Sequence, residues 1–121
     1  MKKIILNLLF LAILLPVTAQ ESGIRFFHGT WDEAIALAKK EKKKIFVDFY
    51  TEWCGPCLNM SLTVFVLPQV GGVYNKNFIC LKIDAEKGEG RELAKRYGVN
   101  SYPTYIFVNP KNQEIVHRSG S

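Results

Sequence analysis

The chain has 121 residues, 48% of them hydrophobic and 22% charged, and a formal net charge of +5 at pH 7. This length suffices for one domain with one hydrophobic core and excludes two such domains. Lys2 and Lys3 lie in a segment that we expect to be removed, so the net charge falls from +5 to +3. That small excess gives no support to a nucleic-acid partner.

The first segment, residues 1–19, has the pattern of a secretory signal peptide. Two lysines precede an apolar run over residues 4–15, and small residues follow up to Ala19. The alternative is a membrane anchor, but a bilayer span needs about 20 apolar residues, and this run has twelve, interrupted by Asn7. We expect cleavage after Ala19, no stable membrane insertion afterwards, a mature domain over residues 20–121, and a periplasmic or secreted location.

Residues 23–27 are a candidate for a short edge strand. Thr30 and Glu33 then form a capping box, in which each side chain can hydrogen-bond the backbone N–H of the other residue. The spacing of the apolar residues that follow predicts a helix to about Lys43, with one face packed on a sheet. We interpret the lysine-rich run over residues 39–44 as the solvated end of this helix. The residues on the packed face are Trp31, Ala34, Ile35 and Ala38.

Residues 45–50 predict a strand that is buried on both faces, and Cys54-Gly55-Pro56-Cys57 follows it at the start of a helix. A thiol in the first turn of a helix faces unpaired N–H groups and the positive end of the helix dipole, which favour the thiolate. Cys54 is therefore the candidate nucleophile. Cys57, three residues later on the same face, is the candidate resolving cysteine. The sulfurs carry the electrons, so we expect no cofactor and no metal.

Asp48 is the one acidic residue within the predicted strand. An outward-facing carboxylate at a strand end fits poorly, because the residues on both sides of Asp48 have the pattern of a buried strand. A buried carboxylate near the thiols can instead accept the proton of Cys57 as that residue attacks, directly or through a water.

After the cysteines, we expect the helix to reach about Val66, and Pro68 to stop it or to start a short helix. Residues 78–84 predict another central strand. Residues 91–97 predict a short helix that Gly98 ends. Strands and helices that alternate in this way indicate an α/β domain.

Pro103 comes immediately before an apolar strand over residues 104–108. Residues 109–112 read Asn-Pro-Lys-Asn, which places proline where a type I turn favours it. A hairpin with a second strand over residues 114–118 is therefore predicted. Taken alone, Pro103 is expected in the trans form, because only about 5–6% of such bonds are cis.

The run Trp53-Cys54-Gly55-Pro56-Cys57, with Asp48 six residues before its first cysteine, resembles the active-site segment of the thioredoxin family. The resemblance implies a thioredoxin fold, a central mixed β-sheet flanked by helices, and activity as a protein-disulfide reductase or thiol:disulfide oxidoreductase. It implies that Asp48 accepts the Cys57 proton. It also implies that Pro103 is cis and faces the cysteine pair, where Trp53, Tyr102 and Pro103 bind an extended protein thiol or disulfide substrate.

The chain departs from ordinary thioredoxins after the cysteines. Leu62 stands where those proteins have a proline inside a long helix, and residues 63–78 are more similar to exported thioredoxin-like proteins. That subgroup includes the C-terminal periplasmic domain of the transmembrane thiol:disulfide interchange protein, which implies a membrane-embedded electron donor. The C-terminal helix of the family is missing after Ser121. Either the chain is a piece of a longer protein or another element covers that face of the sheet.

Three cysteines cannot all pair within one chain, and pairing of Cys54 with Cys57 leaves Cys80 over. By its resemblance to the family, Cys80 stands where many thioredoxins carry a lysine beside the buried aspartate. We therefore expect Asp48 to lack a neighbouring cation and to have a raised pKa.

Two other functions remain possible at this point. The chain could be a non-catalytic binding or folding-assistance module that uses the Tyr102-Pro103 surface without turnover, although such a module needs neither thiol. A zinc site would need about four ligands, so Cys80 or a histidine would have to join the pair.

Overall fold

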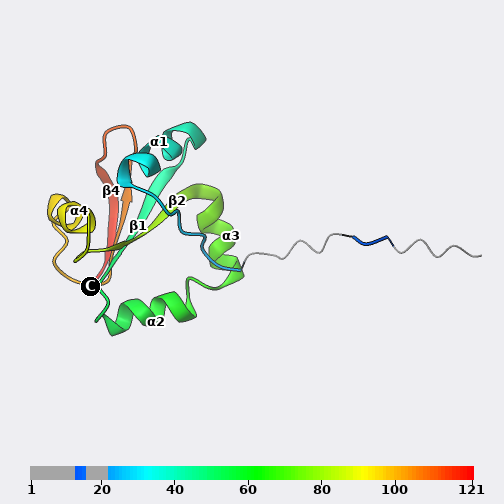
Figure 1. Ribbon diagram of the computed structural model, residues 1–121, viewed down its shortest axis with the longest axis horizontal. Helices are drawn as coiled ribbons and strands as arrows, with labels where there is room; N and C mark the ends of the chain where they lie inside the picture. Colours follow the sequence, from blue (N-terminus) through cyan, green and yellow to red (C-terminus); the bar gives the residue numbers. More distant parts are fainter. Residues whose placement is uncertain (1–12, 16–21) are drawn as a thin grey trace, which may run out of the picture.

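The computed structural model describes residues 13–15 and 22–121. The predicted signal peptide lies outside the described residues except at residues 13–15. Helices and strands alternate along much of the chain, as the sequence predicts (Figure 1). They are α1 (Trp31–Glu41), β1 (Lys44–Tyr50), α2 (Gly55–Thr63), α3 (Pro68–Asn77), β2 (Phe78–Asp84), α4 (Gly90–Arg96), β3 (Thr104–Val108) and β4 (Ile115–Gly120).

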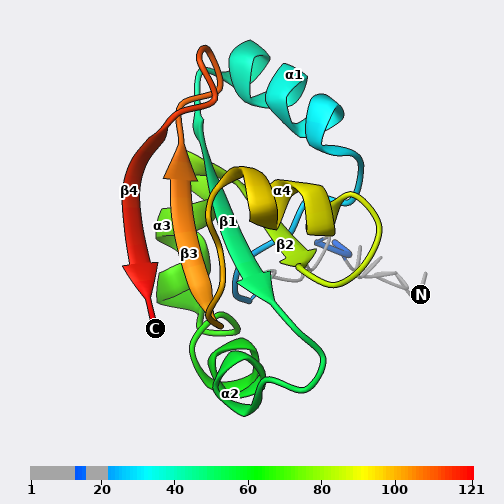
Figure 2. The ribbon, with the colours of Figure 1, turned by 90° about the vertical axis from the view of Figure 1, so that its left-hand side faces the viewer.

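The strands form one mixed sheet in the order β2-β1-β3-β4. β1 pairs in parallel with β2 and antiparallel with β3, and β4 pairs antiparallel with β3. Figure 2 shows α4 in front of the sheet and α3 behind it, and α1 shares one buried cluster with α4. The prediction of a mixed sheet flanked by helices is confirmed. The prediction of β2 as a central strand is wrong, because β2 lies at an edge of the sheet.

Residues 23–27 do not form the predicted strand. Phe26 makes only an isolated parallel bridge with Cys80 of β2. The Ile24 N–H instead donates to the Phe65 carbonyl at 2.7 Å. The backbone of this segment is therefore divided between the edge of the sheet and the loop after α2, and no regular ladder can form.

α1 packs as predicted, but in the capping box the Glu33 carboxylate accepts from the Thr30 hydroxyl instead of from the Thr30 N–H. The Glu33 N–H donates to Thr30 Oγ1 at 3.2 Å, and the Thr30 hydroxyl donates to the Glu33 carboxylate at 3.1 Å. The helix ends at Glu41 because Lys42 adopts a left-handed conformation with φ of 56°. The predicted face is buried, and its residues are Trp31, Ala34, Ile35 and Ala38.

The helix after the cysteines ends at Thr63, three residues before the predicted Val66, and α3 begins at Pro68. α3 continues through two glycines, one of which permits a close backbone approach. A Cβ atom at Gly71 would lie 2.1 Å from the Gly23 carbonyl oxygen. Across the described residues no single helix is long and apolar enough to span a bilayer. Only α2 and α3 taken together, with a bend of 97° between them, have the length and composition of a membrane span.

Candidate active site

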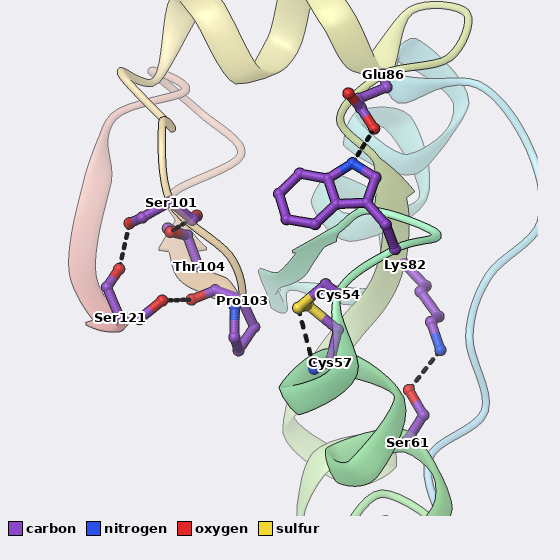
Figure 3. Close-up of a disulfide and its surroundings, with 10 residues drawn as sticks. Cys54, Cys57, Ser61, Lys82, Glu86, Ser101, Pro103, Thr104 and Ser121 are labelled. Atoms are coloured by element: carbon purple, nitrogen blue, oxygen red, sulfur yellow. Dashed lines mark hydrogen bonds between the residues drawn. A yellow bond between two sulfur atoms is a disulfide. The ribbon is translucent and has the colours of Figure 1, made fainter.

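The two cysteines of the motif form a disulfide at the start of α2 (Figure 3). Cys54 is the N-cap residue of the helix and Cys57 lies in its first turn, with their Cα atoms 5.3 Å apart. Pro56 occupies one of the first helical positions, where the absence of an N–H leaves no hydrogen bond unmade. β1 therefore delivers the chain through a short turn to a helix whose first N–H groups surround the sulfurs.

The backbone contributes a hydrogen bond to one sulfur. The Cys57 N–H donates to Cys54 Sγ at 3.1 Å. Both residues are nearly buried, with 6% of Cys54 and 3% of Cys57 exposed. A donor in this position stabilises negative charge on the Cys54 sulfur when the pair is reduced.

The Tyr102–Pro103 peptide bond is cis and immediately precedes β3. Figure 3 shows Pro103 facing the disulfide from this loop. The loop is held by the Thr104 hydroxyl, which donates to the Ser101 carbonyl at 2.7 Å. On the other side, the Ser121 N–H donates to the Pro103 carbonyl at 3.1 Å.

Trp53, the residue before Cys54, is 69% exposed. Its indole N–H donates to Glu86 Oε1 at 2.6 Å (Figure 3). Its ring meets the Tyr102 ring edge to face, with 5.9 Å between the ring centroids. Two residues that the sequence predicts as substrate-binding, Trp53 and Tyr102, are thus in contact with each other.

Asp48 is 1% exposed in the middle of β1, and neither of its carboxylate oxygens has a hydrogen-bond partner among the described residues. Burial raises the pKa of Asp48 from 3.8 to about 6, and the positive charge of Lys82 opposes this rise. A buried carboxylate with this pKa can exchange protons near neutral pH.

The expectation that no cation lies near Asp48 is wrong. The parallel register pairs Asp48 with Lys82 and pairs Cys80 with Phe46. Lys82 hydrogen-bonds Ser61 of α2 (Figure 3). Lys82 lies two residues after Cys80 and therefore on the same face of β2. The alternation of side chains between the two faces of a strand was the signal in the sequence that could have identified Lys82 as the neighbouring cation.

Cys80 lies on the same face of the sheet as Asp48, as expected, but in an apolar cluster with Phe46 and Phe65. The residue is 2% exposed, and burial raises the pKa of its thiol to about 12. Cys80 is therefore a core thiol.

Tyr105 is a further residue beside Asp48 that the sequence pattern does not single out. It is paired with Asp48 across the β1–β3 ladder. Its hydroxyl is buried without a hydrogen-bond partner in the described part of the chain. Burial raises the pKa of Tyr105 to about 12, and the negative charge of Asp48 adds to the effect. Within residues 13–15 and 22–121, no group of three or more His, Cys, Asp or Glu side chains could hold a metal ion.

Comparisons with known proteins agree with this geometry. A family model described as thioredoxin-like matches residues 27–110. Thioredoxin-1 of Drosophila yakuba is 41% identical over 81 residues, which cover 67% of this chain and 70% of that protein. Thiol:disulfide interchange protein DsbD 2 of Pseudomonas aeruginosa is 32% identical over 84 residues, which cover 69% of this chain and 14% of that protein.

A solved structure supports the same assignment. It is the solution structure of a proposed disulphide isomerase from Bacteroides thetaiotaomicron, with 47% identity and a TM-score of 0.71. The match covers 83% of this chain and 82% of that one. Together with the matched family model and the Cys54–Cys57 pair, it indicates a thioredoxin fold with thiol:disulfide oxidoreductase activity. The chain belongs to the thioredoxin-like family.

Proposed function

We propose that this protein is exported and reduces or exchanges protein disulfides outside the cytoplasm through Cys54 and Cys57. The observation that carries the proposal is the position of the pair. The two cysteines open a helix at the end of the strand that holds Asp48, a buried carboxylate without a hydrogen-bond partner among the described residues. This arrangement supplies a nucleophile, a resolving thiol and a proton acceptor.

Cys54 performs the first step. Its thiolate attacks one sulfur of the substrate disulfide, so a bond forms between Cys54 Sγ and that sulfur while the substrate S–S bond breaks. The second substrate sulfur leaves as a thiolate and takes a proton from water. The hydrogen bond from the Cys57 N–H supports this role, because it favours negative charge on Cys54 Sγ.

Cys57 performs the second step. Its thiol gives a proton to Asp48, directly or through a water, and the resulting thiolate attacks the Cys54 sulfur. The Cys54–Cys57 disulfide forms and the remaining substrate sulfur leaves as a thiolate. Because the pKa of Asp48 is about 6, the carboxylate is mostly ionised at neutral pH and can accept this proton.

Trp53, Tyr102 and Pro103 position the substrate. A cis bond turns the backbone, so the Tyr102 N–H and carbonyl become available to an extended segment. Trp53 precedes Cys54, contacts the Tyr102 ring and offers an exposed apolar ring to the same segment. The substrate sulfur then lies between these residues and the nucleophile.

Export rests on the pattern of residues 1–19, and it places the pair in an oxidising compartment. A reductase there needs a source of electrons, for which we propose a membrane-embedded donor. The similarity to DsbD 2 supports this part of the proposal. The cellular role is then redox homeostasis of exported proteins. Mass spectrometry of exported protein is expected to show a chain that begins near Gln20, and retention of residues 1–19 would contradict export with cleavage.

Variants of the two cysteines test the catalytic roles. With a chemical reductant present, the wild-type protein should reduce a generic protein disulfide and Cys54→Ser should lose this turnover. Cys57→Ser should instead accumulate a covalent mixed disulfide, measurable by intact mass. Binding without turnover by the wild-type protein would favour the non-catalytic module. The reduction potential of the pair then decides whether it acts as a reductase or as an oxidase or isomerase.

A further inference from the structure

α2 presents an exposed apolar surface directly beside the nucleophile. Leu58 is 60% exposed and Leu62 is 63% exposed. They are four residues apart, so they lie on the same side of the helix. We call this pair the α2 ridge. An exposed helix surface ordinarily carries charged residues, but the sequence of α2, GPCLNMSLT, contains none.

The α2 ridge takes no part in the folded core. The core-facing side of α2 is formed by Cys57, which is 3% exposed, and by Met60, which packs against the cluster around Phe46. The Leu58 N–H donates to the Cys54 carbonyl at 3.2 Å, so the ridge begins one helical turn from the attacking sulfur. The two leucines therefore lie outside both core clusters of the described chain, with more than half of each residue exposed.

Charged groups near the disulfide belong to other segments than α2 and pair with their own neighbours. Glu52 forms an ion pair with Lys87. Glu86 accepts the Trp53 indole N–H. Lys82 donates to Ser61. The ridge therefore has no charge of its own with which to select a charged partner.

We propose that the α2 ridge docks apolar side chains that flank the reacting cysteine of a non-native polypeptide substrate. This inference rests on the proposed function, since disulfide exchange requires a partner sulfur to bond to Cys54. Leu62 is eight residues beyond Cys54, which is about 12 Å along a helix. An extended partner chain crosses that distance in about four residues. Any substrate bound at Cys54 that runs along α2 therefore passes both leucines.

The chemistry of the substrate follows from where cysteines occur. Cysteine is among the most buried residue types, so a cysteine of a folded substrate is usually surrounded by apolar core side chains. A polypeptide with an unformed or wrong disulfide exposes those apolar neighbours. An uncharged leucine pair beside the nucleophile favours such a chain over a folded substrate with a polar surface around its disulfide.

Single-turnover kinetics test the inference. The fully reduced protein is mixed with one of two symmetrical synthetic peptide disulfides of equal length and charge. In the apolar peptide, leucine and phenylalanine flank the cysteine. In the polar peptide, serine and glutamine flank it. Cystine serves as a small disulfide that cannot reach the ridge. Leu58→Gln/Leu62→Gln is compared with the wild-type protein. Val73→Gln is the matched control, since Val73 is 56% exposed on α3 in a cleft with the lysines before β1.

The second-order rate constant of the double variant with the apolar peptide is expected to fall by about tenfold or more. A tenfold change corresponds to the free energy of burying about one leucine side chain. The double variant's rate constants with the polar peptide and with cystine should not change, and Val73→Gln should match the wild type throughout. Unchanged reaction with the apolar peptide would overturn the inference, as would equal losses for all three disulfides. A wild-type protein that reduces none of them would refute the proposed function itself.

Discussion

The two faces of the sheet differ in the number and kind of side chains that they bury. Among the described residues, the face covered by α1 and α4 buries a cluster of sixteen residues, whereas the cluster on the other face has three buried members. The first cluster is almost entirely apolar, and its member Phe49 is 0% exposed. The second face carries Asp48, Cys80 and Tyr105. Burial raises the pKa of each of these three side chains.

This difference separates stability from chemistry. Burial of an ionisable group costs free energy, and the apolar face supplies the free energy that holds the strands in register despite that cost. The face with Asp48 is then free to keep a carboxylate without a hydrogen-bond partner in the described chain. Substitutions on the two faces should therefore affect stability and catalysis differently.

The largest expected effect is on the apolar face. Phe49→Ala should lower the free energy of unfolding by about 3–5 kcal/mol, because it leaves a cavity in a closed core. Phe107→Ala, on the opposite face, should cost markedly less, because Phe107 is only partly buried. Denaturant midpoints of the reduced proteins measure both. Equal losses of unfolding free energy in the two variants would show that the two faces contribute equally to stability.

Asp48→Asn should stabilise the folded protein at neutral pH by about 3 kcal/mol. The folded pKa of about 6 lies above the unfolded value near 3.8, so the folded acid holds its proton to higher pH. Wild-type stability is therefore lost as pH rises from about 4 through about 6, and the variant should not show this loss. Denaturation at several pH values measures the difference. Release of a mixed disulfide by Cys57 should also slow by at least about tenfold.

Asp84→Asn, a change of the same kind at the end of the neighbouring strand, is the control for this variant. It should leave both the pH dependence and the release rate as in the wild type. If Asp48→Asn is less stable than the wild type at neutral pH and releases substrate at the wild-type rate, Asp48 has a structural role only.

Cys80→Ala should cost about 1 kcal/mol, because it removes one buried sulfur from the smaller cluster. In the wild type, burial that raises the pKa of this thiol to about 12 should prevent its alkylation at mildly basic pH. Reduced protein should therefore label at Cys80 only in denaturant, as shown by mass mapping of the modified cysteines. Rapid labelling of Cys80 in the folded protein would contradict its assignment to the core.

The smallest expected effect follows from Lys82→Gln. Lys82 lowers the pKa of Asp48, so its removal should raise that pKa and move the pH dependence of mixed-disulfide release upward. The stability of the fold should change little, because the Lys82 side chain is exposed. If mixed-disulfide release by the variant has the same pH dependence as in the wild type, the charge of Lys82 does not influence Asp48.

Local sequence determined much of this protein. Capping at Thr30 and apolar spacing from Trp31 to Ala38 fixed the position and packed face of α1. The run over residues 45–50 identified β1 and placed Asp48 in a buried strand. The motif that follows located Cys54 and Cys57 at the start of a helix. These features depend on hydrogen bonds and periodicities within a few residues of one another, which a sequence displays directly.

Only the tertiary structure decided which residues meet. β2 has the apolar pattern of a central strand yet lies at an edge, and the register of its pairing places Lys82 rather than Cys80 opposite Asp48. Likewise, Gly71 contacts Gly23, and Leu58 and Leu62 remain exposed on a helix without charge. Strand order, register and exposure depend on contacts between segments far apart in the chain. Local periodicity identifies the apolar face of an element, but it does not identify the element that covers that face.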